Sequence, residues 1–253
     1  MSPSRRLLFA AVGLVAAIVV LFAVLGRLTR TALPAARPVD QARPGPVLLV
    51  PGYGGDTGGL EALATKLRAA GREASVVPLP GNGTGDLRLD AKALAAAADA
   101  AIAAGAPSVD VVGYSAGGVT ARLWAAAGGR RQARRVVTLG SPHHGTRVAA
   151  LAATVAPGAC PEACQQLVPG SSLLDGLTET PDGPAWLSLW TTQDETVKPP
   201  TSARLTGATN LALQDLCPTA RVSHSDLPRA PEVEGVVLAA LSGPRLVVPR
   251  SCP

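Results

Sequence analysis

Short runs of β-branched and leucine residues alternate along this chain with longer alanine-rich segments, and that alternation most restricts how the chain can fold. Strand-like runs occupy residues 47–50, 74–78, 109–114, 135–139 and 185–191, with a weaker one at 205–211. Helical segments are expected between and after them, at residues 57–70, 87–104, 116–127 and 233–241. Apolar strands joined through helices are typical of a mostly parallel sheet covered on both faces. The sequence therefore predicts an α/β fold.

The length of 253 residues and the hydrophobic content of 47% are enough for one substantial core. We expect one main domain over residues 47–253. Residues 145–184 have mixed signals and form a longer stretch than an ordinary connection between strands. They are predicted to form either a helical cap or a mobile lid.

The N-terminus contains an uncharged apolar stretch at residues 7–25. A helix of that length can cross most of a ~30 Å hydrocarbon layer. No Ala-x-Ala-like cleavage site follows it before Arg43, which favours an uncleaved membrane anchor at 1–30 over a signal sequence. Four prolines at residues 31–46 predict a linker between anchor and domain.

The net charge of +5 does not indicate a nucleic-acid partner. Arg5, Arg6, Arg27 and Arg30 flank the apolar run, so the other 223 residues have 19 cationic against 18 acidic side chains. The remaining basic stretch is interpreted as a solvated connection between a helix and a strand, and contains Arg130, Arg131, Arg134 and Arg135. A nearly neutral body of this kind predicts no nucleic-acid binding.

The most specific motif is Gly113-Tyr114-Ser115-Ala116-Gly117, which follows an apolar strand and precedes a helix. A serine on a strained turn between strand and helix exposes its hydroxyl, and the flanking glycines allow both elements to approach closely. In this setting Ser115 is predicted to be a catalytic nucleophile.

A serine hydroxyl needs a base, and His224 is the only histidine late enough in the chain for the order serine, acid, histidine. The acid should end the strand before that histidine, where Asp194 follows residues 185–191. Asp194 would orient the imidazole and stabilise its protonated form. Glu195, Asp215 and Asp226 remain the alternatives.

An oxyanion formed by attack of Ser115 would need backbone donors. The N–H of Ala116, directly after the nucleophile, is expected to supply one. The other is expected from Tyr53, in the glycine-rich loop after the first strand.

His143 and His144 are expected to shape the pocket or to form local hydrogen bonds. Neighbouring histidines lack the spacing of common metal-ligand pairs, so we expect neither a metal nor another cofactor.

The four cysteines are interpreted as two disulfides, because the spacing of Cys160 and Cys164 is wrong for a zinc knuckle. Three pairings are possible. Proximity favours Cys160 with Cys164, which leaves Cys217 to pair with Cys252 and to hold the C-terminal tail. Disulfides predict a location outside the cytoplasm, either membrane-anchored or secreted.

Five motifs in order give the chain its resemblance to a known family: residues 50–55, residues 113–118, residues 140–146, Asp194 with Val197 and Pro199, and residues 224–228. The sequence resembles the secreted bacterial class 2 lipases and esterases, particularly the actinobacterial triacylglycerol lipases. That resemblance implies an α/β-hydrolase fold and hydrolysis of carboxylic esters, with lipid or small esters as substrates. We expect a monomer.

Two other classes of function remain open. An acyltransferase or thioesterase would use the same three residues, Ser115, Asp194 and His224, with a different acceptor. A tethered binding module on a hydrolase fold would need none of them in register.

Overall fold

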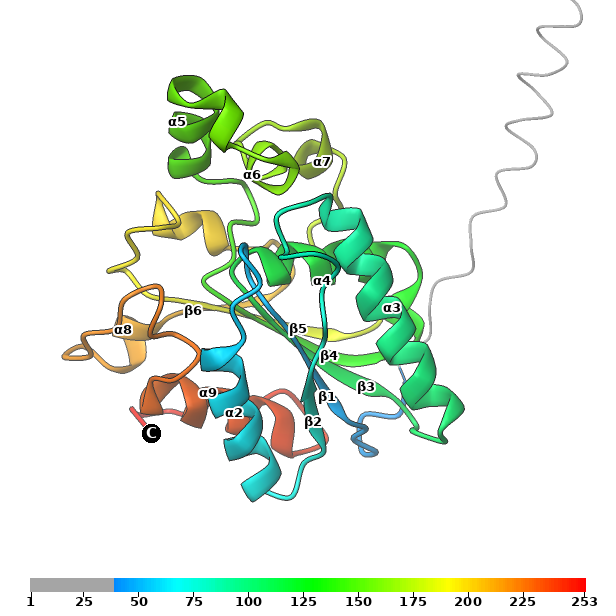
Figure 1. The fold of residues 1–253 in the computed structure, drawn as a ribbon. Helices are drawn as coiled ribbons and strands as arrows, with labels where there is room; N and C mark the ends of the chain where they lie inside the picture. Colours follow the sequence, from blue (N-terminus) through cyan, green and yellow to red (C-terminus); the bar gives the residue numbers. More distant parts are fainter. Residues whose placement is uncertain (1–38) are drawn as a thin grey trace, which may run out of the picture. The chain divides into compact units, whose positions relative to one another are not determined.

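The computed structural model describes residues 39–253 (Figure 1). The segment expected to be a membrane anchor or signal sequence, at residues 1–30, lies outside the described residues, as do residues 31–38 of the expected linker. Within the described part, no helix has both the length and the apolarity that a membrane crossing requires.

Six strands within residues 39–253 form one sheet, in the order β2-β1-β3-β4-β5-β6. The strands are β1 (Val47–Val50), β2 (Ala74–Val76), β3 (Val109–Tyr114), β4 (Ala133–Leu139), β5 (Ala185–Trp190) and β6 (Thr209–Ala212). Every neighbouring pair is parallel. The predicted α/β fold with a mostly parallel sheet is confirmed.

Helices cover both faces of the sheet, and the alternation of side chains along each strand divides the core in two (Figure 1). On one face, α2 (Gly58–Ala69) and α9 (Pro231–Ser242) pack against strand residues such as Leu49 and Val112. On the other face, α3 (Leu87–Ala103) and α4 (Ala116–Ala126) pack against neighbours such as Leu48 and Val111. This pattern explains why the strands are apolar throughout.

The stretch for which a cap or lid is expected contains three helices, α5 (Arg147–Val155), α6 (Glu162–Gln166) and α7 (Ser172–Asp175), with the 3₁₀ turn η2 (Pro157–Ala159). We call residues 147–175 the helical segment. In Figure 1 it lies above α4, away from α2 and α9. It has a small core of its own, in which Ala163, Leu167 and Leu173 pack with Val119 of α4.

The other short elements are η1 (Gly129–Arg131), η3 (Pro200–Ala203) and α8 (Leu213–Leu216). Strand β6 is shorter than the weak run at 205–211 suggests, because Leu205 and Ala208 precede it in a turn.

The solvated interpretation of Arg134 and Arg135 is wrong. Both belong to β4, which begins at Ala133, and both side chains are fully buried. Arg134 forms two hydrogen bonds with Asp110 of β3, at 2.9 and 2.5 Å. Arg72 binds the same carboxylate at 2.7 Å. Buried arginines are tolerated here because carboxylate and carbonyl oxygens accept hydrogen bonds from their guanidinium groups.

Two disulfides join Cys160 to Cys164 and Cys217 to Cys252, the pairs that proximity favours. The first closes a four-residue separation within the helical segment. The second closes a separation of 35 residues that includes α9. Structural disulfides are typical of proteins outside the cytoplasm.

Candidate active site

Ser115 occupies a strained turn between β3 and α4. Its φ of 53° makes it the one non-glycine residue in the left-handed region among residues 39–253. Such a conformation costs a non-glycine residue of order 1–3 kcal/mol and persists only where the surroundings impose it. Here the Ser115 amide donates to the carbonyl of Leu139 in β4 at 2.8 Å, which fixes the end of β3.

Backbone packs closely against backbone around Ser115, and this requires small residues there. A Cβ added to Gly117 would collide with the carbonyl oxygens of Val50 and Pro51, at the end of β1. A Cβ on Gly113 would stand 2.6 Å from the carbonyl oxygen of Gly117. These contacts give a physical reason for both glycines of the motif.

The structure brings Ser115, His224 and Asp194 together in one hydrogen-bonded row. Nε2 of His224 lies 3.0 Å from Oγ of Ser115, and Nδ1 of His224 lies 2.6 Å from Oδ2 of Asp194. All three side chains are buried, with Asp194 fully excluded from solvent. A nucleophile, a base and an orienting acid have this arrangement in serine hydrolases.

The second oxygen of Asp194 is held by the backbone. Oδ1 accepts hydrogen bonds from the amides of Thr196, at 2.9 Å, and Val197, at 2.7 Å. The turn after β5 therefore fixes the carboxylate and directs Oδ2 to the imidazole. This support was not part of the sequence-based interpretation, although an aspartate followed closely by free amides is a recognisable turn pattern.

The other acidic residues considered from the sequence do not hydrogen-bond His224. Glu195 is exposed and pairs with Lys198 at 2.9 Å. Asp226 is also exposed and accepts hydrogen bonds from the backbone and hydroxyl of Ser223, whose hydroxyl also lowers the Asp226 pKa. Asp215 lies in the first turn of α8. Among these candidates, Asp194 alone contacts His224.

Two residues outside the predicted set hold the loop that carries His224. The Tyr114 hydroxyl donates a hydrogen bond to the His224 carbonyl at 3.2 Å, and the centroids of the two rings lie 5.2 Å apart. Burial, and next the charge of Asp194, raises the pKa of Tyr114 to about 12, so the phenol remains a donor at neutral pH. Thr191 donates to the Val222 carbonyl at 2.8 Å, which joins the end of β5 to the same loop.

The two amides expected to stabilise an oxyanion have no acceptor within residues 39–253. Neither the Tyr53 N–H nor the Ala116 N–H donates a hydrogen bond there. Ala116 is the first residue of α4, where an amide lacks an acceptor within the helix and the helix dipole favours negative charge. A Cβ on Gly52 would stand 2.9 Å from Cβ of Ser115, so the loop after β1 passes directly beside Ser115.

His143 follows β4, and its imidazole is almost completely buried. Its Nε2 is 3.1 Å from the Thr138 hydroxyl, while burial, followed by the charge of Arg122, holds the His143 pKa well below its usual value. His144 instead hydrogen-bonds Glu179 at 2.9 Å. Neither contacts Ser115.

Arg122 was not singled out from the sequence, yet it joins α4 to the residues just after the helical segment. Its buried guanidinium donates to the carbonyls of His143, Leu177, Thr178 and Glu179. Burial lowers its pKa to about 10, which still leaves it charged at neutral pH.

An apolar pocket of about 200 Å³ opens beside Ser115. Tyr53 and Val197 line it from the loops after β1 and β5, while Val148 and Leu167 line it from the helical segment. The side chains of the pocket are mainly apolar, so it suits an aliphatic group bound next to the Ser115 hydroxyl.

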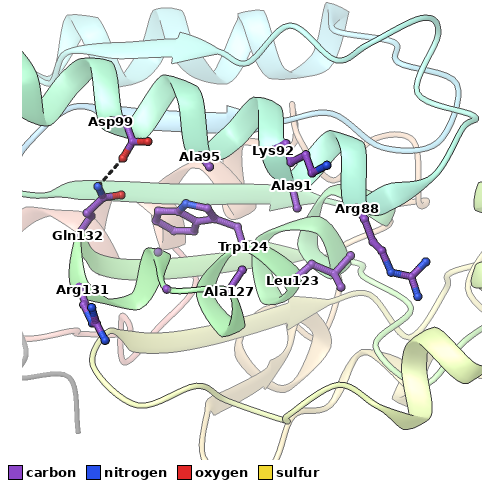
Figure 2. A pocket seen from close by; sticks show the side chains of 12 residues that line it. Arg88, Ala91, Lys92, Ala95, Asp99, Leu123, Trp124, Ala127, Arg131 and Gln132 are labelled. Atoms are coloured by element: carbon purple, nitrogen blue, oxygen red, sulfur yellow. Dashed lines mark hydrogen bonds between the residues drawn. The ribbon is translucent and has the colours of Figure 1, made fainter. Parts of the chain in front are cut away.

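A larger cavity, of about 610 Å³, lies between α3 and α4. Figure 2 shows Trp124, Ala91 and Ala95 along it, with Asp99 bonded to Gln132 at 2.7 Å. Its lining contains no serine, threonine, cysteine or histidine. This cavity is the larger of the two, but the smaller pocket is the one lined by Ser115, which lies within hydrogen-bond distance of His224.

No protein-family model and no curated protein sequence matches this chain. Solved structures match in fold. Lipase B of Aspergillus fumigatus has a TM-score of 0.66 at 20% identity, covering 87% of this chain and 60% of the lipase chain. The mature form of Bacillus licheniformis lipase BlEst2 has a TM-score of 0.55 at 21% identity, covering 71% of this chain and 86% of that one.

A third match is MGS-MChE2, an α/β hydrolase from a lagoon-sediment metagenome. Its TM-score is 0.53 at 16% identity, covering 78% of this chain and 90% of that one. At such identities the likeness establishes the fold, and this chain has the α/β-hydrolase fold. The chain spans 60% of the length of the Aspergillus lipase. The narrower resemblance to class 2 lipases stays a prediction.

Proposed function

We propose that this α/β-hydrolase hydrolyses carboxylic esters through an acyl-enzyme intermediate, with Ser115 as nucleophile, His224 as base and Asp194 as orienting acid. One observation carries the proposal, the hydrogen-bonded row from Ser115 Oγ through His224 to Asp194, with contacts of 3.0 and 2.6 Å. An inactive binding module would have no need to hold these three side chains in register.

The proposed reaction begins when Ser115 Oγ attacks the ester carbonyl carbon and His224 Nε2 takes the hydroxyl proton. Asp194 stays ionised and stabilises the imidazolium. The Tyr53 and Ala116 amides donate to the oxyanion, where each such donor typically contributes ~2.7–4 kcal/mol. His224 then returns the proton to the leaving alcohol, and an ester bond joins the acyl group to Ser115. Water, activated by the same histidine, releases the acid and restores the serine.

Apolar acyl groups are the proposed substrate class, as in acylglycerol-like lipids. Support comes from the apolar pocket at Ser115, two of whose lining side chains, Tyr53 and Val148, are exposed apolar groups. Each methylene group buried in such a pocket contributes about 0.8 kcal/mol. Medium-chain esters should therefore react faster than acetyl esters.

The proposed location is outside the cytoplasm. The two disulfides support it. Attachment to a membrane through residues 7–25 is a further part of the proposal and rests on the sequence of that segment alone.

The deciding experiment is covalent labelling with a fluorophosphonate, which reacts with activated serines. Wild-type protein should be labelled at Ser115, while Ser115→Ala should not be labelled and should lose nearly all esterase activity, by analogy with the ~10⁶-fold loss on deleting a nucleophile of this kind. Unlabelled wild-type protein would support the binding module instead. Products analysed in water with and without added alcohol would separate hydrolysis from acyl transfer.

A further inference from the structure

A second cavity, of about 380 Å³, is formed by the same helical segment that covers the pocket at Ser115. Adjacent or nearby residues of this segment line opposite cavities. Ala152, Cys164 and Leu167 line the pocket at Ser115, whereas Ala153, Cys160 and Val168 line the second cavity. Both cavities therefore border the same short stretch of chain, which we call the wall between them.

A disulfide bond lies at the centre of that wall. Cys164 faces the pocket at Ser115, Cys160 faces the second cavity, and a disulfide joins them. Both cysteines are buried among the core residues of the helical segment. Side chains in a wall can change rotamer to admit a longer ligand, but a disulfide between two short side chains cannot move aside without displacing the backbone.

The other part of the wall is Leu167, which directly follows α6. Its side chain is buried and lines the pocket, and its carbonyl accepts the amide of Thr146 at 3.0 Å. Gln165 stiffens the same turn by donating to the carbonyl of Cys160 at 2.9 Å. Hydrogen bonds therefore hold both parts of the wall, the disulfide and Leu167.

We propose that the Cys160–Cys164 disulfide, together with Leu167, sets the longest acyl chain that the active site accepts, by closing the pocket at Ser115 off from the second cavity. This inference rests on the proposed ester hydrolysis. The pocket at Ser115 is small, about 200 Å³, so the limit should lie among medium-chain acyl groups, on the order of eight carbons.

The test is a series of p-nitrophenyl esters from acetyl to palmitoyl, each below its micelle-forming concentration. For wild-type protein, kcat/KM should rise by up to about fourfold per methylene, which is 0.8 kcal/mol expressed as a rate ratio, and should then fall beyond about eight carbons. In Cys160→Ala/Cys164→Ala the rise should continue. The ratio of laurate to butyrate activity should increase about tenfold or more, because at least two further methylenes are buried.

Three further variants make the test specific. Cys217→Ala/Cys252→Ala removes the other disulfide and should leave the laurate-to-butyrate ratio at its wild-type value. Leu167→Ala opens the wall with both disulfides intact and should raise the ratio, which protects the test against misfolding of the cysteine variant. Ala153→Leu, added to Cys160→Ala/Cys164→Ala, fills the second cavity and should cancel the gain.

The outcomes separate this inference from the proposed function. Esterase activity with an unchanged laurate-to-butyrate ratio in both wall variants would overturn the inference and leave the function standing. An equal rise in Cys217→Ala/Cys252→Ala would also overturn it, since general loosening would then explain the change. Absence of any ester hydrolysis or fluorophosphonate labelling in wild-type protein would overturn the function itself.

Discussion

A methyl group on Gly140 would stand 3.2 Å from Nδ1 of His224. It would also lie 3.3 Å from Oδ2 of Asp194 and 2.5 Å from Cδ1 of Leu227. Gly140 directly follows β4 and has a φ of +56°. The contact between His224 and Asp194 is therefore made directly over a glycine, and the space for it depends on the missing side chain.

Gly140→Ala should lower esterase activity by at least tenfold, because the methyl group displaces Leu227 and separates the imidazole from Asp194. Gly71→Ala is a matched control, since Gly71 also has a positive φ, of +78°, but no atom within 4 Å of the added methyl group. Both variants should lose about 1–2 kcal/mol of stability from the left-handed backbone. Comparable activity losses in both, measured as kcat/KM at a temperature well below unfolding, would contradict this explanation.

Asp194→Asn should be far more damaging than Glu195→Gln. An amide in place of the carboxylate favours the wrong imidazole tautomer. The corresponding substitution in a serine protease lowers kcat by ~10⁴. Glu195 is exposed and its substitution should change kcat less than twofold. Steady-state rates on one ester decide between them, and equal losses would remove Asp194 from its assigned role.

Asp110→Ala should destabilise the fold by about 3–5 kcal/mol, since it leaves the buried Arg134 without its carboxylate partner. The exposed Asp175 serves as the control, and Asp175→Ala should cost less than about 0.5 kcal/mol. Urea denaturation measures both. Because Asp110 and Arg134 lie away from Ser115, the folded Asp110→Ala protein should still react with a fluorophosphonate. A cost below about 1 kcal/mol would argue against a buried ion pair.

Stability should also depend on Asp90, in the first turns of α3. Burial, and next the negative charge of Asp86, raises the Asp90 pKa to about 6 from an ordinary value of 3.8. The folded protein therefore binds this proton more tightly than the unfolded chain does. The resulting stabilisation is present below about pH 4 and is lost as pH rises through 6, a change of up to about 3 kcal/mol.

Asp90→Asn should remove that dependence, so that the variant is more stable than wild type at pH 8 but not at pH 4. Asp99→Asn, at an exposed position of the same helix, should follow the wild-type profile. Thermal unfolding from pH 4 to 8 gives the comparison. A wild-type-like profile for Asp90→Asn would mean that Asp90 ionises normally.

The sequence predicted the sheet well where strands are buried on both faces. Residues 109–114 match β3 in full, since an apolar run of that kind has few other stable arrangements. The start of β4 was missed, because Arg134 and Arg135 suggest solvent. Their burial depends on Asp110 and on carbonyls of residues 240–243, which are distant in the sequence.

The positions of Ser115, His224 and Asp194 could be predicted because motif and chain order constrain them. The residues that hold these three side chains and their loops in place could not be predicted. Tyr114 contacts His224 across 110 positions of the sequence, and Arg122 reaches carbonyls some 55 positions away. Such contacts involve backbone carbonyls, which every residue offers, so the residue types alone give no pairing signal.

The bond between Cys217 and Cys252 gives the C-terminal part of the molecule the topology of a covalent ring, and His224 is a member of it. A protease that cuts once between residues 218 and 251 would therefore leave His224 covalently attached, either through the backbone to Cys217 or through the disulfide at Cys252. Nicked protein would stay one covalent molecule without a reductant and would separate into two pieces with one. His224 is thus retained after a backbone break that would release an ordinary tail.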